Sequence, residues 1–466
     1  MQPDNPRCED ILTERLIAMI NKARGLKQTA GGSLLRVEIE SPGLQPLVWL
    51  AAQTLACKLY WADRTGDLEA AGVGEADVIE DEGDRSAAEA IAEVERRCAA
   101  IGGKVRYYGG FAFDSMGGAA GRHDGQNWGG FGRYRFVLPK VEVVRENGRT
   151  VVATNVRCSG ETFDCVKRDV LRGLENISFV SGVAGSNLPL VLSRTDLPDR
   201  GVWDDMIRET IKELAKGSFA KVVLARQAIL EMSGPVEAVS LLKRIAESTT
   251  GAYNFCFALS AHNAFLGATP ECLFRRNKDS LYSEAVAGTV LTGESELEQQ
   301  HYRGILAKSV KDCEEHSYVV QGIRKGLDEL CTEVRVVDDR DIVCLGYVQH
   351  FYSRFSGELR DAISTADIIS KLHPTAAVNG HPSDAALDHV RACEPFDRGW
   401  YAGLVGWIGV DDSEFAVAIR SAKVSGTRIL VFAGAGIVRG SAPDAEWEET
   451  ASKLSLFLDA INGRAR

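Results

Sequence analysis

Three charged residues near the end of the chain share the spacing of one helix face. Glu446, Glu449 and Lys453 follow Pro443, and proline is favoured in the first turn of a helix. At about 100° per residue these positions fall within a sector of roughly 60°, so two carboxylates and an ammonium group point the same way. One interpretation is a solvated, charged helix surface. The other is a binding face beside the glycine-rich segment that precedes the helix.

The strands that must position this helix are predicted from the hydropathy pattern. Two alternating apolar runs, 401–410 and 414–423, flank a polar turn at 411–413, which is the pattern of a hairpin. A third run, 428–433, leads into Gly434-Ala435-Gly436. We expect a small-residue turn at these three positions, where a ligand can approach the backbone closely.

A lysine and a glutamate earlier in the chain could act as a base and an acid. Lys221 begins the apolar run KVVLARQAILEM, which predicts a strand. A lysine at such a place is commonly a solvent-facing residue, but a lysine buried away from water can lose its proton and act as a base. Glu271 follows Thr269 and Pro270 where a predicted strand meets a turn. An isolated Pro-Glu pair indicates nothing by itself.

The segment 294–330 is predicted to be one long helix. Lys308, Lys311, Asp312 and Glu315 lie at i, i+3, i+4 and i+7 on a single face of this helix. A stripe of salt bridges along the helix surface explains such a pattern. The spacing alone gives these carboxylates no further role.

Together these segments resemble one protein family. EPFDRGWYAG from Glu394, AIRSAK from Ala418, AGAGIVRGS from Ala433 and EWEETASK from Glu446 are similar to the C-terminal signature of the chorismate-utilising enzymes. Upstream, KVVLAR, TPE, AGT, KDCEEH and HPTAAV occur in the order found in that family. The resemblance covers nearly the whole chain and is closest to the isochorismate synthases of the menaquinone route.

The resemblance implies a fold. We expect an α/β fold, α+β in detail, in which two large, mainly antiparallel β-sheets pack together. Helices lie on the outside, and the site lies at one edge between the sheets. The resemblance also implies a single domain, 1–466, with an N-terminal scaffold half at about 1–200 and a catalytic half at about 203–462.

The reaction implied by the resemblance is the reversible, Mg²⁺-dependent isomerisation of chorismate to isochorismate. Lys221 is the implied base for the water that attacks C2, and Glu271 is the implied acid that protonates the C4 hydroxyl as it leaves. No redox cofactor is implied, since nothing is oxidised. We expect the product to serve menaquinone biosynthesis, with a siderophore pathway as the alternative.

The remaining site residues are also implied by the family. Glu315 and Glu449 are the implied Mg²⁺ ligands, a sparse set that suits this ion, with Asp312 and Glu446 behind them. A guanidinium inside an apolar strand is well suited to hold a carboxylate. The implied substrate contacts are Gly288, Thr289, His373, Ala377, Val378, Tyr401, Arg420, Gly434, Ala435, Gly436 and Lys453.

Three other functions are weighed against this one. A salicylate synthase would go on to eliminate pyruvate, but its loops usually lack the HPTAAV and EWEET forms. An aminating relative would need ammonia or a glutaminase subunit, and Lys221 argues against it. A chorismate-binding protein without activity is the non-enzymatic alternative. It is disfavoured because Lys221, Glu271, Glu315 and Glu449 are all present.

Composition limits the partners and the compartment. The chain of 466 residues has a net charge of −11 and no basic block, which argues against nucleic-acid and anionic-membrane partners. Its 11 cysteines include no C-x-x-C pair, so reduced thiols in a cytoplasmic protein are expected. We find no secretory signal and no membrane-spanning run. The expected partner is a small-molecule substrate, chorismate, and the expected state is a monomer without an obligate glutaminase subunit.

Overall fold

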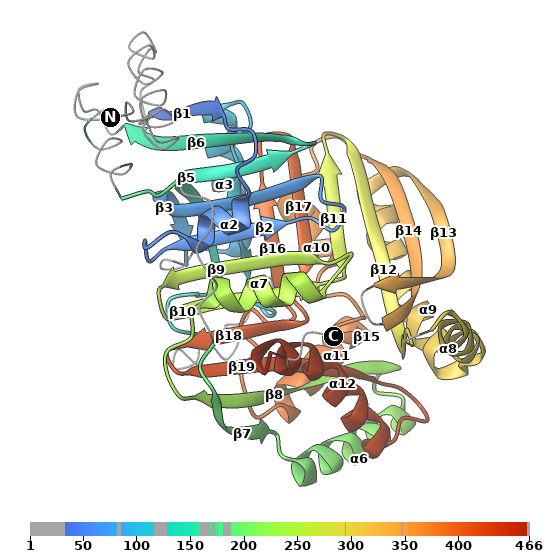
Figure 1. Ribbon diagram of the computed structural model, residues 1–466. Helices are drawn as coiled ribbons and strands as arrows, with labels where there is room; N and C mark the ends of the chain where they lie inside the picture. Colours follow the sequence, from blue (N-terminus) through green and yellow to red (C-terminus); the bar gives the residue numbers. More distant parts are fainter. Residues whose placement is uncertain are drawn as a thin grey trace.

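The structure is a computed structural model of the chain (Figure 1). It describes residues 33–81, 85–115, 128–158, 168, 174, 176–179, 188–293, 295–345 and 348–463. Antiparallel strands with helices around them form the described part. The α/β fold with antiparallel sheets that the resemblance implies is therefore confirmed. Among the described residues, no helix combines the length and the apolar character needed to cross a bilayer.

Eleven strands follow one another in a front layer that begins in the N-terminal half and ends in the C-terminal half. Every pairing in it is antiparallel, and β2 pairs directly with β9, so the two halves share this layer. In order across the layer the strands are β1 (Ser33–Glu40), β6 (Arg149–Cys158), β5 (Tyr134–Glu146), β3 (Leu68–Glu80), β2 (Lys58–Ala62), β9 (Tyr253–Ser260), β10 (Asn263–Thr269), β18 (Ser421–Ser425), β19 (Arg428–Ile437), β8 (Lys221–Met232) and β7 (Val191–Leu197).

Seven strands form a rear layer, and Figure 1 shows part of it behind the front layer and part of it beside that layer, at the right. The long strand β5 also pairs with β4, so the two layers belong to one hydrogen-bonded network. The short β15 (Gly380–His381) pairs with β8. In order the rear strands are β4 (Tyr107–Phe111), β16 (Leu404–Ile408), β17 (Asp412–Val417), β11 (Cys272–Asn277), β12 (Ser280–Leu291), β14 (Val348–Leu359) and β13 (Cys331–Leu345).

Two apolar clusters hold these layers. Trp61 and Phe255 of the front layer and Phe111 and Phe415 of the rear layer belong to one cluster of buried side chains. A second cluster lies where helices cover the other face of the front layer, with α7 against β10 and α12 against β19 (Figure 1). Burial of this apolar surface is the main favourable term for the fold. Side chains of α2 (Pro46–Ala51), α7 (Ala238–Ser248) and α12 (Pro443–Ile461) belong to the second cluster, and α3 (Ala87–Ile101) is one of the helices that contribute to the first.

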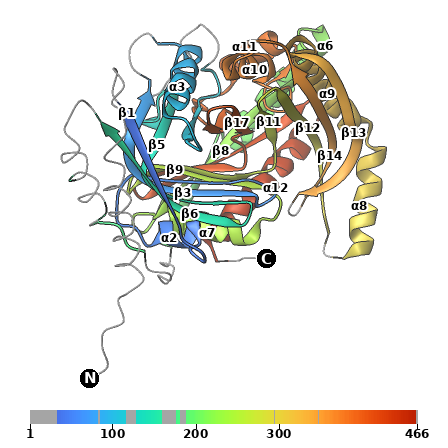
Figure 2. The same ribbon diagram turned by 90° about the horizontal axis from the view of Figure 1, so that it is seen from above.

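The other helices lie around the rear layer and the edge of the front layer. Figure 2 shows α8 and α9 beside the curved strands β12, β14 and β13. α11 packs against β8. Their bounds are α6 (Arg200–Lys216), α8 (Glu296–Lys308), α9 (Val310–Leu330), α10 (Thr365–Leu372) and α11 (Ser383–Cys393).

Two local predictions are confirmed and two are wrong. β16 and β17 form the predicted hairpin, and α12 begins at Pro443. The segment predicted as one helix is two, because extended Ser309 ends α8 and its hydroxyl accepts the Asp312 N–H to cap α9. Gly434-Ala435-Gly436 is no turn. These residues continue β19 in register with β8, since small residues remain compatible with the ladder.

Candidate active site

A cavity of about 80 Å³ lies where the end of β19 meets β8, β12, α9 and α12. Strands from both layers and two helices contribute side chains to it, although these segments are far apart in the sequence. Charged side chains and apolar side chains share its wall, and charged groups placed within an apolar wall can fix the orientation of a small ligand. The predicted site residues that line it are Glu271, Gly288, Thr289, Glu315, Ala377, Val378, Tyr401, Arg420, Gly434, Glu449 and Lys453.

Six predicted residues do not line the cavity. Lys221 and Gly436 lie immediately behind Glu315. Ala435 belongs to the first apolar cluster, and its side chain lies on the opposite face of β19 from Gly434. His373 is buried at the end of α10, edge-on to Phe113 with ring centroids 6.3 Å apart. The remaining two, Asp312 and Glu446, lie beside the cavity on α9 and α12.

Lys221 is held at the start of β8 in a fully buried position. Its Nζ lies 3.0 Å from Oε1 of Glu315, which α9 places against the same strand end. Gly436 makes this approach possible. A Cβ at this position would lie 2.3 Å from Glu315 Oε1 and 3.2 Å from Lys221 Cε, so only glycine leaves room for the pair.

Glu271 lies at the end of β10, and its side chain is only 2% exposed. Its carbonyl accepts a hydrogen bond from Val417 N at 3.0 Å, and Thr375 Oγ1 donates to its Oε1 at 3.3 Å. Burial raises the pKa of Glu271 to about 7, against the opposing effects of Thr375 and Lys221. A large fraction of this carboxyl is therefore protonated at neutral pH and able to donate a proton.

Four carboxylates gather between α9 and α12. Lys453 Nζ donates to Glu449 Oε1 at 2.6 Å and to the Gly434 carbonyl at 2.9 Å. Burial acts to raise the pKa of Glu449, but Lys453, with smaller contributions from Lys311 and Lys221, holds that pKa below its usual value. Behind it, Lys311 Nζ donates to Glu446 Oε1 at 2.6 Å. Burial, together with the nearby charge of Glu315, raises the pKa of Asp312. Three of the four carboxylates therefore have a lysine as an ion-pair partner, with Lys221 on Glu315 as the third pair.

Two of these carboxylates, Glu315 and Glu449, face the cavity. Among the described residues no group of three or more metal-ligating side chains is found. A pair of carboxylates beside open space still fits Mg²⁺, which takes few protein ligands and completes its octahedron with water and substrate oxygens. The same pair does not fit Zn²⁺, which requires three or four protein ligands.

Arg420 gives the cavity a positive group. It follows β17 with a left-handed backbone, at a φ of 48°, and its guanidinium lines the cavity. Within the described ranges it forms no ion pair, and burial lowers its pKa. A partly buried guanidinium without a carboxylate partner is suited to bind an anionic ligand.

The cavity wall also contains a residue that the sequence analysis did not identify. His350 on β14 lines the cavity, and its Nδ1 lies 3.0 Å from the Gly288 carbonyl and 3.1 Å from Thr289 Oγ1. Because a carbonyl only accepts, Nδ1 carries the hydrogen and Nε2 is an acceptor. Burial lowers the pKa of His350 to about 3, so the ring is neutral. A histidine within the apolar run VQHFYSRF was the available signal.

Apolar and aromatic groups complete the wall. The ring of Tyr401 stacks on Phe432 at a centroid distance of 5.0 Å and an angle of 14°. Gly434 allows this, since a Cβ there would lie 3.0 Å from the Tyr401 hydroxyl oxygen. Ala377 and Val378 line the cavity from the loop before β15. These surfaces suit the face of a small ring.

Within the described ranges, the cavity combines a buried carboxyl of raised pKa with a guanidinium that has no ion-pair partner, and a buried lysine lies behind its wall. Such a site, in an antiparallel two-layer fold, is suited to bind a small anionic ligand. The comparison with known families agrees. The chain belongs to the family described as chorismate binding enzyme, whose model matches residues 18–462.

Individual relatives are isochorismate synthases. The chain is 34% identical over 363 residues to the chloroplastic isochorismate synthase of Catharanthus roseus, covering 76% of this chain and 62% of that protein. It is 31% identical to the isochorismate synthase MenF of Escherichia coli, covering 88% and 89% of the two chains. The solved structure of that menaquinone-specific enzyme superposes with a TM-score of 0.84 and 28% identity, covering 96% of this chain and 99% of that one.

Proposed function

We propose that this protein is an isochorismate synthase, which converts chorismate to isochorismate reversibly. The observation that carries the proposal is that Glu271, whose pKa burial raises to about 7, lines the cavity, while the buried Lys221 lies behind the cavity wall against Glu315. An allylic exchange of hydroxyl groups needs a base for the incoming water and an acid for the leaving hydroxyl. Relatives with this activity align over most of the chain, which supports the assignment.

The proposed reaction balances without a redox partner. Lys221 removes a proton from water as the water oxygen bonds to C2 of chorismate. The ring double bond shifts, the C4–O bond breaks, and Glu271 gives its proton to the departing hydroxyl. One water enters and one leaves, so the product is an isomer of the substrate. The elevated pKa of Glu271 supports its role as the acid.

The proposed substrate contacts divide by charge. Arg420 and Lys453 hold the enolpyruvyl carboxylate, because they are the cationic side chains that line the cavity. Ala377, Val378 and Tyr401 contact the ring. The backbone amides of β19 near Gly434 approach the ligand from a strand and not from the turn that was expected. Gly288 and Thr289 complete the set where β12 bulges.

Mg²⁺ is the proposed cofactor, held by Glu315 and Glu449 with Asp312 and Glu446 behind them. When bound, it would neutralise the carboxylates and orient the ring carboxylate of the substrate. We expect Glu449→Ala to lower activity strongly and to abolish the response to added Mg²⁺. Isothermal titration with Mg²⁺ checks the same point without turnover. An active variant that still binds Mg²⁺ like the wild type would remove Glu449 from the metal site.

We further propose that the product enters menaquinone synthesis, as the name of the Escherichia coli relative suggests.

The organisation of the chain is part of the proposal, and the strand pairing of β2 with β9 supports a single functional unit. Eight cysteines within the described ranges are free, which supports a reducing compartment such as the cytoplasm. A monomer without a glutaminase subunit is part of the same proposal.

A product assay tests the proposed function. The purified protein is incubated with chorismate, with Mg²⁺ or with EDTA, and the mixture is separated by chromatography. We expect isochorismate in equilibrium with chorismate, and only in the presence of Mg²⁺. Salicylate together with pyruvate would instead identify a salicylate synthase. No conversion, with or without ammonia, would favour a chorismate-binding protein.

A further inference from the structure

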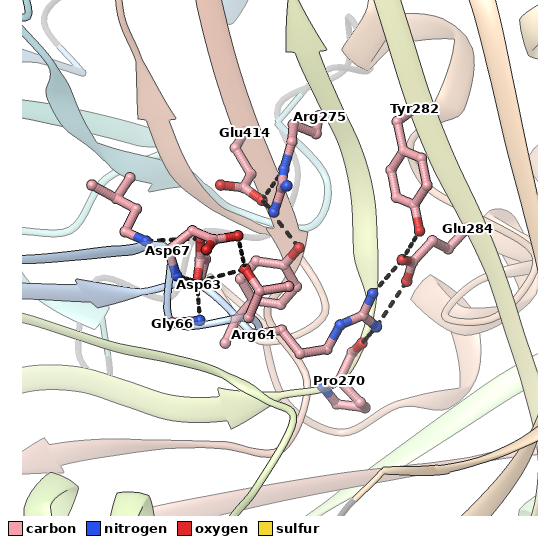
Figure 3. A network of polar contacts seen from close by, with 12 residues as sticks. Asp63, Arg64, Gly66, Asp67, Pro270, Arg275, Tyr282, Glu284 and Glu414 are labelled. Carbon is pink, nitrogen blue, oxygen red and sulfur yellow. Dashed lines mark hydrogen bonds and ion pairs between the residues drawn. The ribbon is translucent and has the colours of Figure 1, made fainter. Parts of the chain in front are cut away.

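A buried polar network links the N-terminal half of the chain to the peptide just before Glu271. Arg64, in the loop between β2 and β3, donates from Nη1 to the Pro270 carbonyl at 3.1 Å and to Glu284 Oε2 at 2.9 Å. Its Nη2 donates to Glu284 Oε1. Figure 3 shows the guanidinium between the carboxylate and the proline. The planar guanidinium of Arg64 therefore binds both β12 of the rear layer, through Glu284, and the segment that carries Glu271.

The loop that presents Arg64 is itself fixed by hydrogen bonds. Asp63 Oδ1 accepts the N–H groups of Gly66 at 2.6 Å and Asp67 at 3.0 Å, and Asp63 Oδ2 accepts the Leu68 N–H at 3.0 Å (Figure 3). This arrangement is a side-chain cap on a tight turn. The backbone of Arg64 is thus held in place, and its guanidinium can act as a rigid support.

Glu284 is also fully supplied with donors. Besides Arg64, its Oε1 accepts the hydroxyl of Tyr352 at 2.7 Å and the hydroxyl of Tyr282. Its side chain is fully buried, while that of Arg64 is 15% exposed. The guanidinium also lies over the rings of Tyr253 and Tyr352, at 5.7 and 6.0 Å from their centroids. An ion pair this well enclosed has one strongly preferred geometry.

We propose that Arg64, together with Glu284, is a positioning residue for Glu271: it fixes the carbonyl that precedes the acid and the charge beside it. The inference rests on the proposed function, since Glu271 is the acid of that reaction. Arg64 does not line the cavity and touches no substrate. Its effect passes through the Pro270–Glu271 peptide, so it is the orientation of the carboxyl that depends on it.

Three neighbouring groups, two of them charged, shift the pKa of Glu271. Glu284 on β12 raises the pKa of Glu271, Lys221 on β8 lowers it, and the Thr375 hydroxyl lowers it as well. Replacing Glu284 by glutamine removes one negative neighbour and leaves the cation of Arg64 in place. The loss of the Glu284 charge and the unpaired cation of Arg64 both favour ionisation of Glu271. The alkaline limb of the activity profile, where the acid loses its proton, must then move to lower pH.

The first experiment compares two double variants. Arg64→Met with Glu284→Gln removes the ion pair without leaving a buried carboxylate unpaired. Arg275→Met with Glu414→Gln is the matched control, since that pair lies in the same network but does not contact Pro270 (Figure 3). We expect the first variant to lower kcat by about 10²-fold with KM within twofold, and the control to keep both values. Equal kcat in the two double variants would overturn the proposal.

The second experiment does not need turnover. The difference in urea midpoint between the wild type and Glu271→Gln, followed from pH 5 to 9, reports the titration of Glu271. The same difference is measured in the Glu284→Gln background, where we expect the titration at lower pH. An unchanged titration overturns the proposed coupling whatever the substrate is. If this shift is found but chorismate is not converted, the positioning network stands and the proposed function fails.

Discussion

The cavity and the polar network of Figure 3 both bury charged side chains, but they differ in how their arginines are paired. In the network Arg64 is paired with Glu284, whereas the cavity pairs Glu315 and Glu449 with lysines and leaves its arginine without a carboxylate among the described residues. The guanidinium of Arg64 has a carboxylate, a carbonyl and two aromatic rings as partners. Arg420, which lines the cavity, has no ion-pair partner in the part of the chain that the structure describes. Burial lowers the pKa of both groups, yet the carboxylate of Glu284 raises that of Arg64 above its usual value, and the pKa of Arg420 stays lowered.

This difference separates a structural cluster from a binding site. Buried charges that satisfy one another fix the backbone around them and leave no capacity for a ligand. The buried Nε2 of His350 has no hydrogen-bond partner among the described residues, and the partly buried guanidinium of Arg420 has no ion-pair partner there. Such groups cost stability until a ligand supplies the partner. The polar network and the cavity meet at Pro270 and Glu271, where the network holds the backbone that carries Glu271.

The largest effect is expected when the proposed acid or base is removed. Glu271→Gln keeps the shape of the side chain but not the proton, and Lys221→Ala removes the amine. We expect each variant to lower kcat by about 10²–10⁴-fold, the usual contribution of general acid–base catalysis. Chorismate binding should stay within a fewfold of the wild type, because the proposed anchors are intact. Steady-state kinetics and calorimetric titration with chorismate measure the two quantities.

The chain offers a second buried lysine as the control. Lys423 is 1% exposed, and burial lowers its pKa to about 7. Its Nζ donates to the Val424 carbonyl at 2.9 Å and lies over the ring of Phe131, away from the cavity. Lys423→Met should therefore keep the wild-type kcat. Normal turnover by Lys221→Ala or Glu271→Gln would refute the acid–base assignment.

Local features of the fold were predictable wherever one stretch of sequence decides them. The β16–β17 hairpin and the start of α12 follow from alternation, a polar turn and a proline. The break at Ser309 was missed because the charged face continues across it, and only the capping geometry interrupts the helix. The triplet at Gly434 was misassigned because small residues serve a close approach to Tyr401 and Glu315 and not a turn.

The site was predictable through motifs and not through single residues. The resemblance named Glu271, Glu315 and Glu449 before any contact was known, and the structure brings them to one cavity. His350 was not predicted as a site residue, because a single polar residue in an apolar strand has many possible causes. Arg64 escaped because its partners are more than 200 positions away in the sequence, and no local pattern reports such a contact.

An intermediate effect is expected when the unpaired guanidinium of the cavity is removed. Arg420→Met should raise the KM for chorismate by about 10–100-fold, since a hydrogen-bonded charge contributes about 1.5–3 kcal/mol. The melting temperature should stay the same or rise, because the variant removes a partly buried cation that lacks a partner. Arg420→Lys keeps the positive charge but loses the planar guanidinium, so its KM should lie between those of the wild type and Arg420→Met. A strong loss of stability with unchanged KM would mean that Arg420 is paired within the protein, like the charges of the polar network.

The last prediction concerns stability and not activity, and it follows from the burial of an unpaired acid. Burial raises the pKa of Glu271 from about 4.5 to about 7, so the folded state holds its proton more tightly than the unfolded state. The resulting stabilisation is fully present below pH 4.5 and is lost as the pH rises through 7, by roughly 3 kcal/mol in total. Urea unfolding at pH 5 and pH 8 should thus show Glu271→Gln gaining on the wild type at the higher pH. A difference independent of pH would mean that Glu271 is paired like the charges of the network, and such a carboxyl could not serve as an acid near neutral pH.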